Sequence, residues 1–547
     1  MPSRISRKDA PVAKGFDYIV IGGGSAGSVV AARLSEDPEA RVLLLEAGGA
    51  DRSLLLRMPL AFRILRSKML FDWGLESEPE PHALDRRVPA ARGRVLGGSS
   101  SVNGLMYSRG HPRDYDQWAQ MGAQGWSFDE VLPYFRKSER SWRGASDWHG
   151  DAGPLSVSPM SRRDPLTQAI EATARLMGLP VTDDFEGVQP EGFGLPDLTT
   201  HRGHRASASR AFLAPARRRP NLVIVTSAQV RRILVERGRA AGVTYVAGGV
   251  RHTIRAGREM ILCAGAYASP HLLMLSGLGP ADHLREHGID VIADISGVGR
   301  NLQEHPLAPM SFRARKGFPF GGELRADRVA ASAVLWGLTG RGMMGTQPLT
   351  SIAFHKSREG LERPDLETMF MPTSFDARVW FPGVRERAED RMTVLNVALR
   401  PGSRGSVSLR SPDPDDKPVI RFNLLSDPDD LAALRYCARW TREILTQGPI
   451  ADYVGEEAFP GPAAQSDADL DAAIRATVVT AQHPIGTCRM GADGDEGAVV
   501  DPALRLRGVE GLRIADASVM PTLIGGHTNA PAIMIGERAA EMILGER

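Results

Sequence analysis

The first strongly patterned part of the chain combines apolar runs with a glycine-rich turn. Residues 18–21 are apolar or aromatic throughout, which predicts a buried strand. Small and apolar residues then recur at helical spacing through residues 25–34, and an apolar run at residues 42–45 predicts another strand. The glycine-rich turn at residues 22–27 joins the first strand to the helix. This order predicts a βαβ unit and therefore a parallel sheet.

The turn has the spacing Gly-x-Gly-x-x-Gly, with Ser25 between Gly24 and Gly27. In a dinucleotide site Gly22 would allow the tight turn, Gly24 would let the backbone approach a pyrophosphate, and Gly27 would let helix and strand pack closely. Free N–H groups at the start of the helix attract phosphate. Glu46 ends the second strand, about twenty residues past the last glycine, where a carboxylate can accept a hydrogen bond from a ribose hydroxyl. Together these residues predict a dinucleotide-binding site.

Strand patterns return in the middle of the chain. Residues 222–225 and 230–235 predict two strands that pair antiparallel in a small sheet on the nucleotide fold. Residues 259–263 predict a further strand that runs into a helix, with Ser269 as its cap. Residues 329–340 come nearest to a membrane span, but their length is that of a core helix, since a span needs about 18 apolar residues.

At 547 residues the chain is too long for one core, so we expect two or three lobes. Motif-rich segments predict a discontinuous cofactor-binding domain that comprises residues 15–160, 200–306 and 480–547. The less regular segments predict a substrate-binding domain that comprises residues 161–199 and 307–479. Residues 1–14 are basic but have no apolar stretch, which predicts a disordered tail and not a signal peptide.

Charge and cysteine content narrow the class of protein. The formal net charge of +2 gives no reason to expect a nucleic-acid partner. Three cysteines cannot build a disulfide framework, which favours a reducing compartment. We therefore expect a cytoplasmic protein without a transmembrane segment, and peripheral contact with the inner face of the membrane stays open.

One short segment matches a zinc-hydrolase pattern. His283, Glu286 and His287 have the spacing H-x-x-E-H, which places two imidazoles one helical turn apart. The segment lies between a glycine-rich turn and a strand-like stretch, which favours a polar surface helix. We therefore expect no metal site and keep a zinc hydrolase as the less favoured alternative.

Several motifs in order resemble the glucose–methanol–choline (GMC) family of FAD-dependent oxidoreductases, in its choline dehydrogenase-like and alcohol dehydrogenase-like branch. They cover residues 22–27 with 46–49, 92–110, 265–279, 297–305, 400–405, 483–491, 516–521 and 529–536. The resemblance implies an α/β fold, α+β overall, with a Rossmann-type FAD-binding domain. It also implies a discontinuous substrate domain built on a six-stranded antiparallel sheet.

The resemblance further implies FAD as the cofactor. The implied contacts are Gly22, Gly24, Ser25, Gly27, Glu46, Gly97, Gly98, Asn103, Gly104, Val230, Asp516 and Ala517. Some family members attach the flavin through a histidine at the position of Val102. Because valine has no nucleophilic atom, we expect FAD to be bound without a covalent link.

The family resemblance also suggests catalytic residues. Oxidation of a primary alcohol to an aldehyde requires loss of the hydroxyl proton and departure of a hydride, and imidazole suits the proton because its pKa is near ~6.5. His483 occupies the position of the family's catalytic histidine, and Asn529 the position of its partner. Asn529 can donate an amide hydrogen bond but cannot be a base, so His483 is the expected proton acceptor. His527 is an alternative partner.

Other relatives of this fold are photodecarboxylases or hydroxynitrile lyases, and both stay as alternative reactions. The photodecarboxylases lack the histidine found here at position 483, which favours alcohol oxidation. Residues 488–491 resemble the dehydrogenase-like branch, so we expect a quinone or another electron acceptor to outperform oxygen. The alcohol is not identified; the aromatic residues expected near it are Trp336, Phe370, Phe375, Trp380 and Phe381.

Overall fold

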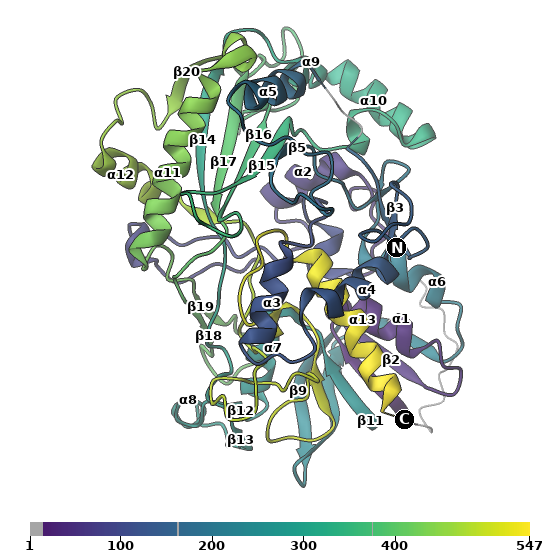
Figure 1. The fold of residues 1–547 in the computed structure, drawn as a ribbon. Helices are drawn as coiled ribbons and strands as arrows, with labels where there is room; N and C mark the ends of the chain where they lie inside the picture. The colour runs from purple at the N-terminus through teal and green to yellow at the C-terminus, as the bar shows by residue number, and fades with distance from the viewer. Residues whose placement is uncertain (1–14, 161–163, 375, 547) are drawn as a thin grey trace.

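The computed structural model describes residues 15–160, 164–374 and 376–546, and it has two sheet-containing lobes (Figure 1). The predicted tail at residues 1–14 lies outside the described residues. In Figure 1 the upper lobe contains the second sheet. The predicted α/β class is confirmed, whereas the exact domain boundaries stay a prediction.

The first sheet contains the predicted βαβ unit. Its parallel strands are β1 (Phe16–Ile21), β2 (Val42–Glu46), β8 (Leu222–Thr226), β11 (Val250–Leu262) and β22 (Leu512–Ile514). β1 lies between β2 and β11, with Ile21 opposite both Leu45 and Leu262. The helix α1 (Ser25–Leu34) provides the crossover from β1 to β2. All four last residues of β1 are buried, as expected for a strand covered on both faces.

The predicted antiparallel pairing of residues 222–225 with 230–235 is wrong. β8 pairs parallel with β2, whereas β9 (Ala228–Glu236) pairs antiparallel with β10 (Arg239–Ala247). A single residue, Ser227, separates the two strands and has a φ of 55°. One residue is too short for a hairpin loop, so the chain bends there and enters a different part of the sheet.

The second sheet is antiparallel throughout, as the family resemblance implies. Six strands lie in a row: β20 (Val454–Phe459), β14 (Pro306–Ala314), β17 (Arg391–Ala398), β16 (Leu366–Met371), β15 (Ser351–His355) and β5 (Gly192–Gly194). A short seventh strand, β21 (Val479–Thr480), also pairs with β14. One face of this sheet packs against α5 (Pro165–Leu176) and α11 (Pro428–Leu445), visible in the upper lobe. The opposite face turns toward the first lobe.

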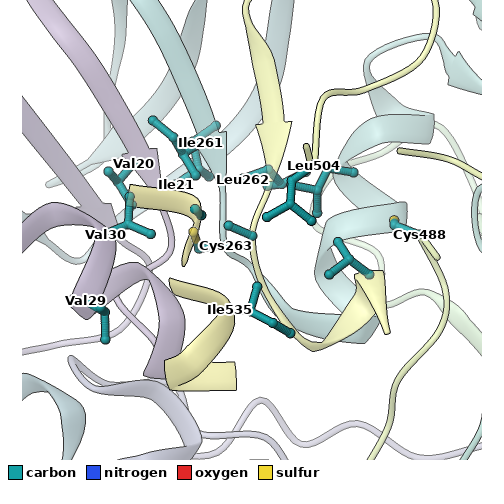
Figure 2. Packing of buried hydrophobic residues seen from close by; sticks show 14 of the residues in the cluster. Val20, Ile21, Val29, Val30, Ile261, Leu262, Cys263, Cys488, Leu504 and Ile535 are labelled. Carbon is teal, nitrogen blue, oxygen red and sulfur yellow. The ribbon is translucent and has the colours of Figure 1, made fainter. Parts of the chain in front are cut away.

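The core of the first lobe forms where β1, β11 and α1 meet the C-terminal helix α13 (Asn529–Gly545). Figure 2 shows Val20, Val30, Ile261 and Ile535 packed in this core. A Cβ atom at Gly27 would lie 1.9 Å from the carbonyl oxygen of Gly22. A side chain is therefore excluded at the point where α1 approaches its own turn.

The apolar stretch predicted as a core helix lies at the surface instead. It forms α10 (Ala326–Thr339), in which Trp336 is the one fully buried residue. Trp336 donates its indole N–H to the Gly203 carbonyl, whereas Val334, Leu335 and Leu338 are 63%, 46% and 81% exposed. Among the residues described, no helix combines the length and apolarity needed to cross a bilayer.

The remaining helices and paired strands connect and cover the two sheets. The helices are α2 (Phe62–Ser67), α3 (Pro112–Gln120), α4 (Phe128–Ser138), α6 (Ala214–Ala216), α7 (Gly265–Leu275), α8 (Ala281–Glu286), α9 (Pro319–Glu323) and α12 (Asp467–Thr477). The two-stranded pairs are β3 (Glu139–Ser141) with β4 (Leu155–Val157), β6 (Thr200–His201) with β7 (His204–Arg205), β12 (Leu278–Gly279) with β13 (Ala293–Asp294), and β18 (Ser406–Ser408) with β19 (Val419–Arg421).

The close approach at Gly27 yields a first prediction. Gly27→Ala should displace the glycine-rich turn and lose most of the bound cofactor, because the new methyl group meets backbone atoms that cannot rotate away. Gly337→Ala in α10 is the matched control, since its methyl group meets no atom within 4 Å. The control should keep its cofactor and gain roughly 0.5–1 kcal/mol of stability from helix propensity. Flavin absorbance per protein and thermal unfolding measure both effects; full flavin content in Gly27→Ala would contradict the prediction.

Candidate active site

A cavity of about 600 Å³ lies between the first sheet and the second. Its size is within the range of small-molecule and cofactor sites. The predicted site residues that line it are Gly22, Gly24, Ser25, Glu46, Gly98, Asn103, Gly104, Val230, His483, Asp516, Ala517 and Asn529. The lining residues do not include Gly27 and Gly97, which pack behind it against backbone and serine side chains.

The dinucleotide end of the cavity is built by backbone turns held by one carboxylate. The Glu46 carboxylate accepts the N–H of Gly23 at 2.8 Å and that of Gly48 at 2.7 Å. Burial raises the pKa of Glu46 to about 7, and these two donors oppose the rise. The first turn of α1 has no side-chain cap, so its N–H groups remain available to a phosphate.

The loop of residues 97–104 lies directly on the first glycine turn. Gly97 donates its N–H to the Gly23 carbonyl at 2.7 Å, and a Cβ at Gly98 would lie 2.8 Å from the Cα of Gly24. Asn103 is held from behind by Arg205, a fully buried guanidinium that donates to its side-chain oxygen at 2.7 Å. The sequence analysis did not find Arg205, because no local motif contains it.

Asp516 joins two turns at the carboxyl ends of β11 and β22. One carboxylate oxygen accepts the N–H of Gly265 at 2.8 Å and the hydroxyl of Ser269 at 2.6 Å. The other oxygen accepts the N–H of Ser518. Ser269 is therefore not the helix cap that the sequence predicts, since α7 already begins at Gly265.

These contacts show how well the residues fit a dinucleotide cofactor. Three turns at the carboxyl ends of parallel strands line one cavity, where ligands bind in open α/β sheets. Gly22 lies against the Cys263 backbone and Gly98 lies against Gly24, so neither contact leaves room for a side chain. The first turn of α1 has no side-chain cap, which leaves its N–H groups available. The chemistry of this donor set fits the pyrophosphate and ribose of FAD.

Three histidines meet at the other end of the cavity. His483 and His305 face each other through their Nδ1 atoms at 3.0 Å. The ring of His527 lies 4.8 Å from that of His483, edge to face. His527 in turn contacts the Glu367 carboxylate through Nε2 at 3.1 Å. His305 and Glu367 come from segments that the sequence analysis did not connect with catalysis.

The surroundings drive the pKa values of these imidazoles apart. Burial, reinforced by the neighbouring imidazoles of His527 and His305, lowers the pKa of His483 well below its usual value. Burial also lowers the pKa of His305 to about 3. Burial alone would lower the pKa of His527 too, but the Glu367 carboxylate outweighs it and raises that pKa. The cluster thus combines neutral imidazoles with one that favours the charged form.

Glu304 holds the backbone of the cluster. Its carboxylate accepts the N–H of His483 at 2.5 Å and that of His305 at 3.1 Å. Burial raises the pKa of Glu304 to about 8, while the guanidinium of Arg92 opposes the rise. Glu304 lies inside the motif at residues 297–305, but its role emerges from the distant segment it binds.

Asn529 lies at the start of α13, away from the contacts of the histidine cluster. Its side-chain oxygen accepts the hydroxyl of Ser25 at 2.8 Å. The Ser25–Asn529 pair therefore joins the starts of two helices at the cavity wall. The hydrogen-bond partner of Asn529, Ser25, is therefore on the cofactor side, whereas His527 contacts His483.

Two other groups of predicted residues lie elsewhere. The ring of His283 accepts the N–H of Leu409 through Nε2, and α8 ends at Glu286, so the H-x-x-E-H segment holds a turn in place. The cavity lining does not include any described member of the predicted aromatic group, which comprises Trp336, Phe370, Trp380 and Phe381. Phe375 lies outside the described residues. Phe370 instead packs beneath α5 and α11, because successive residues of a strand face opposite sides.

Known proteins and solved structures match this chain over nearly its full length. Oxygen-dependent choline dehydrogenase of Brucella ovis is 44% identical over 97% of this chain and 95% of its own. The oxygen-dependent choline dehydrogenase of Sinorhizobium fredii is 43% identical over 97% of this chain and 96% of its own. Among solved structures, pyridoxine 4-oxidase from Mesorbium loti is 33% identical with a TM-score of 0.87, covering 97% of this chain and 100% of its own. A formate oxidase of Aspergillus oryzae RIB40 is 29% identical with a TM-score of 0.90, covering 98% of this chain and 99% of its own.

Family models identify the same relationship across both lobes. The two models described as GMC oxidoreductase match residues 16–307 and residues 401–536. The formate oxidase carries FAD, and FAD is the cofactor of this chain. The chain therefore belongs to the GMC oxidoreductase family and is an FAD-dependent enzyme that oxidises alcohols at a CH–OH group.

Proposed function

We propose that the enzyme oxidises a primary alcohol to an aldehyde, with His483 as proton acceptor and His527 as a cation beside the reacting oxygen. The observation that supports these roles is the histidine cluster, in which His483 contacts His305 and His527 contacts the Glu367 carboxylate. Groups whose pKa values are driven apart in one site are suited to opposite proton roles. The family match favours alcohol oxidation over decarboxylation, cyanohydrin cleavage and zinc hydrolysis.

The glycine turns, Glu46 and Asp516 would hold FAD, which when bound supplies the hydride acceptor. Val102 lines the cavity and has no nucleophilic atom, so the chain would hold the cofactor without a covalent link. The glycine-rich loop at residues 97–104 and the starts of α1 and α13 then enclose it. These elements orient the cofactor and exclude water from the reacting atoms.

The contact between His483 and His305 couples the tautomers of the two rings. One of the two Nδ1 atoms must carry the hydrogen, because they lie 3.0 Å apart. If His483 donates through Nδ1, its Nε2 is left with a free lone pair that can take the hydroxyl proton. His305 then acts as a positioning residue, since it fixes both the tautomer and the ring plane of the base.

His527 would act on the oxygen that loses the proton. A protonated imidazole there offers a hydrogen bond and a positive charge to the developing alkoxide. Glu367 occupies Nε2, which leaves Nδ1 for the substrate. Burial, together with the positive charge of His527, lowers the pKa of His483 and favours its neutral form. Asn529, bonded to Ser25, is better placed to support the cofactor.

The pH dependence tests the role of His483. Because its pKa is lowered, kcat/KM should be constant near neutral pH and fall at acidic pH as His483 takes a proton. Because the pKa of His527 is raised, a second fall is expected at alkaline pH as His527 loses its proton. His483→Ala should keep its flavin, lower kcat/KM by about 10²–10⁴-fold and abolish the acidic limb.

The control is Glu367→Gln, which should move the alkaline limb to lower pH and leave the acidic limb in place. A His483→Ala enzyme with full flavin and less than about threefold loss of kcat/KM would remove His483 from the mechanism.

A direct comparison separates His527 from Asn529. His527→Asn keeps a donor toward Glu367 but loses the charge, so kcat/KM should fall by about 10²–10³-fold with normal FAD content. Asn529→Ala should instead weaken FAD binding, and its kcat/KM at saturating FAD should fall by less than about tenfold. A larger catalytic loss in the flavin-saturated Asn529→Ala enzyme would assign the substrate contact to Asn529.

The relatives' name makes choline the first alcohol to test and oxygen the competing acceptor. We propose that a quinone or another carrier is the better acceptor and that α10 contacts a membrane surface. Supporting this, Val334, Leu335 and Leu338 are exposed on α10 between the exposed cations Arg328 and Arg341. Apolar side chains flanked by cations suit an anionic lipid surface. α10 also packs on Met58 and Leu60, just before the cavity-lining helix α2.

A vesicle assay tests both proposals together. Phosphatidylglycerol-containing vesicles carrying a long-chain quinone should bind the enzyme and support turnover faster than oxygen does. Leu335→Ser combined with Leu338→Ser should lower vesicle binding and quinone turnover by on the order of tenfold, because buried apolar area is lost. Turnover with a water-soluble dye should be unchanged in this variant. Hydrogen peroxide formed in wild-type enzyme at the dye rate would reject the quinone.

A further inference from the structure

We infer that the substrate end of the cavity selects an alcohol with an uncharged, apolar body and disfavours a quaternary ammonium alcohol. The inference rests on the proposed oxidation of a primary alcohol at the histidine cluster. It concerns the groups that surround the rest of the substrate beyond its hydroxyl-bearing carbon.

The wall around that end is built by one face of the second sheet. Leu307, Met369, Met371 and Leu395 line the cavity from β14, β16 and β17. Met369 and Leu395 are direct neighbours across two strands, so their side chains form one continuous surface. Further apolar residues of the cavity lining include Phe62, Leu65, Val102, Leu105, Met106, Pro348 and Leu349. This surface favours burial of a hydrocarbon group.

A quaternary ammonium group needs a carboxylate or a cage of aromatic faces. On the cavity face of β16 the carboxylate is Glu367, which is 1% exposed and already bonded to His527. Its carboxylate already contacts the His527 imidazole, whose pKa it raises, so a second cation would have to compete for the same charge. A cation placed there would also be repelled by His527.

The carboxylates in the described cavity lining also have partners. Glu46 and Asp516 accept backbone N–H groups at the cofactor turns. Asp72 accepts the N–H of Gly74 and lies in the field of the Arg66 guanidinium. Asp415 pairs with Arg231, and Asp416 accepts the Ser411 hydroxyl; both lie in the loop before β19.

The aromatic faces in the lining are also occupied by cations. The Arg94 guanidinium lies 4.6 Å from the centre of the Trp73 ring, and that of Arg92 lies 5.7 Å from the centre of the Tyr267 ring. Among the Phe, Tyr and Trp side chains of the described lining, this leaves Phe62, and one ring does not form a cage. Arg66 and Arg92 line the cavity too and add repulsion for a cation.

A pair of alcohols that differ in one atom tests the inference. Choline and 3,3-dimethylbutan-1-ol have the same shape, but the second has carbon in place of the charged nitrogen. With the purified holoenzyme and a dye acceptor, we expect kcat/KM for the neutral alcohol to exceed that for choline by about tenfold or more. Equal values, or a preference for choline, would overturn the inference and leave alcohol oxidation intact.

A binding measurement removes catalysis from the comparison. Trimethylglycine and 3,3-dimethylbutanoate form the corresponding non-reactive pair, and calorimetric titration of the holoenzyme should show about tenfold tighter binding of the second. Tighter binding of trimethylglycine would count against the inference. Failure of every alcohol to bleach the flavin without oxygen would instead reject the proposed function, and the inference with it.

Substitution at Met371 tests the missing charge directly. Met371 is half-buried on the cavity face, two positions beyond Met369 and away from Glu367. Met371→Glu should shift the preference toward choline by about tenfold relative to Met371→Gln, which has the same shape without the charge. An equal preference in the two variants would show that charge at this wall does not select the substrate.

Discussion

The site depends on the close approach of backbone segments that carry no side chain at their contacts. Gly27 lies against the Gly22 carbonyl, Gly97 donates to Gly23, and Gly98 lies against Gly24. These contacts stack the loop of residues 97–104 on the turn that begins α1. A Cβ atom at any of these contacts would push the loop of residues 97–104 away from the turn that begins α1. The cofactor side of the cavity would then lose its shape. These contacts fix the first-lobe side of the cavity, which the second sheet faces.

Charge is distributed unevenly over that frame. His305 is buried and His483 is half-buried beside His527, and the lowered pKa of both favours their neutral forms, whereas Glu367 raises the pKa of His527. The Glu367 carboxylate favours the charged form of His527. The positive charge of His527 then disfavours protonation of the nearby His483, which stays in the neutral form that can act as a base. The Glu304 carboxylate meanwhile holds both inner histidines by their backbones, so the geometry does not rely on side-chain packing alone.

Local patterns predicted the parts of the structure that depend on neighbouring residues. The strand, turn and helix of residues 16–34 follow from apolar spacing and glycines, and Glu46 follows from its distance to them. The predictions failed for residues whose contact partners are distant in the sequence. Ser269 has a hydroxyl that could cap a helix, but this hydroxyl donates a hydrogen bond to Asp516 instead. The stretch at residues 329–340 has core-like composition, yet Trp336 alone anchors it and the rest faces solvent.

The catalytic cluster shows why the sequence could not place every site residue. His527 and Asn529 are two positions apart, and nothing local distinguishes the one that faces the base. The distinction comes from β16, where Glu367 and Met369 point to the cavity while Thr368 and Phe370 point to α11. A register slip of one residue would bury Glu367 beneath α11 and put Phe370 in the site. Strand pairing in the second lobe therefore decides which histidine is charged, and through it both the proton chemistry and the apolar wall that the substrate meets.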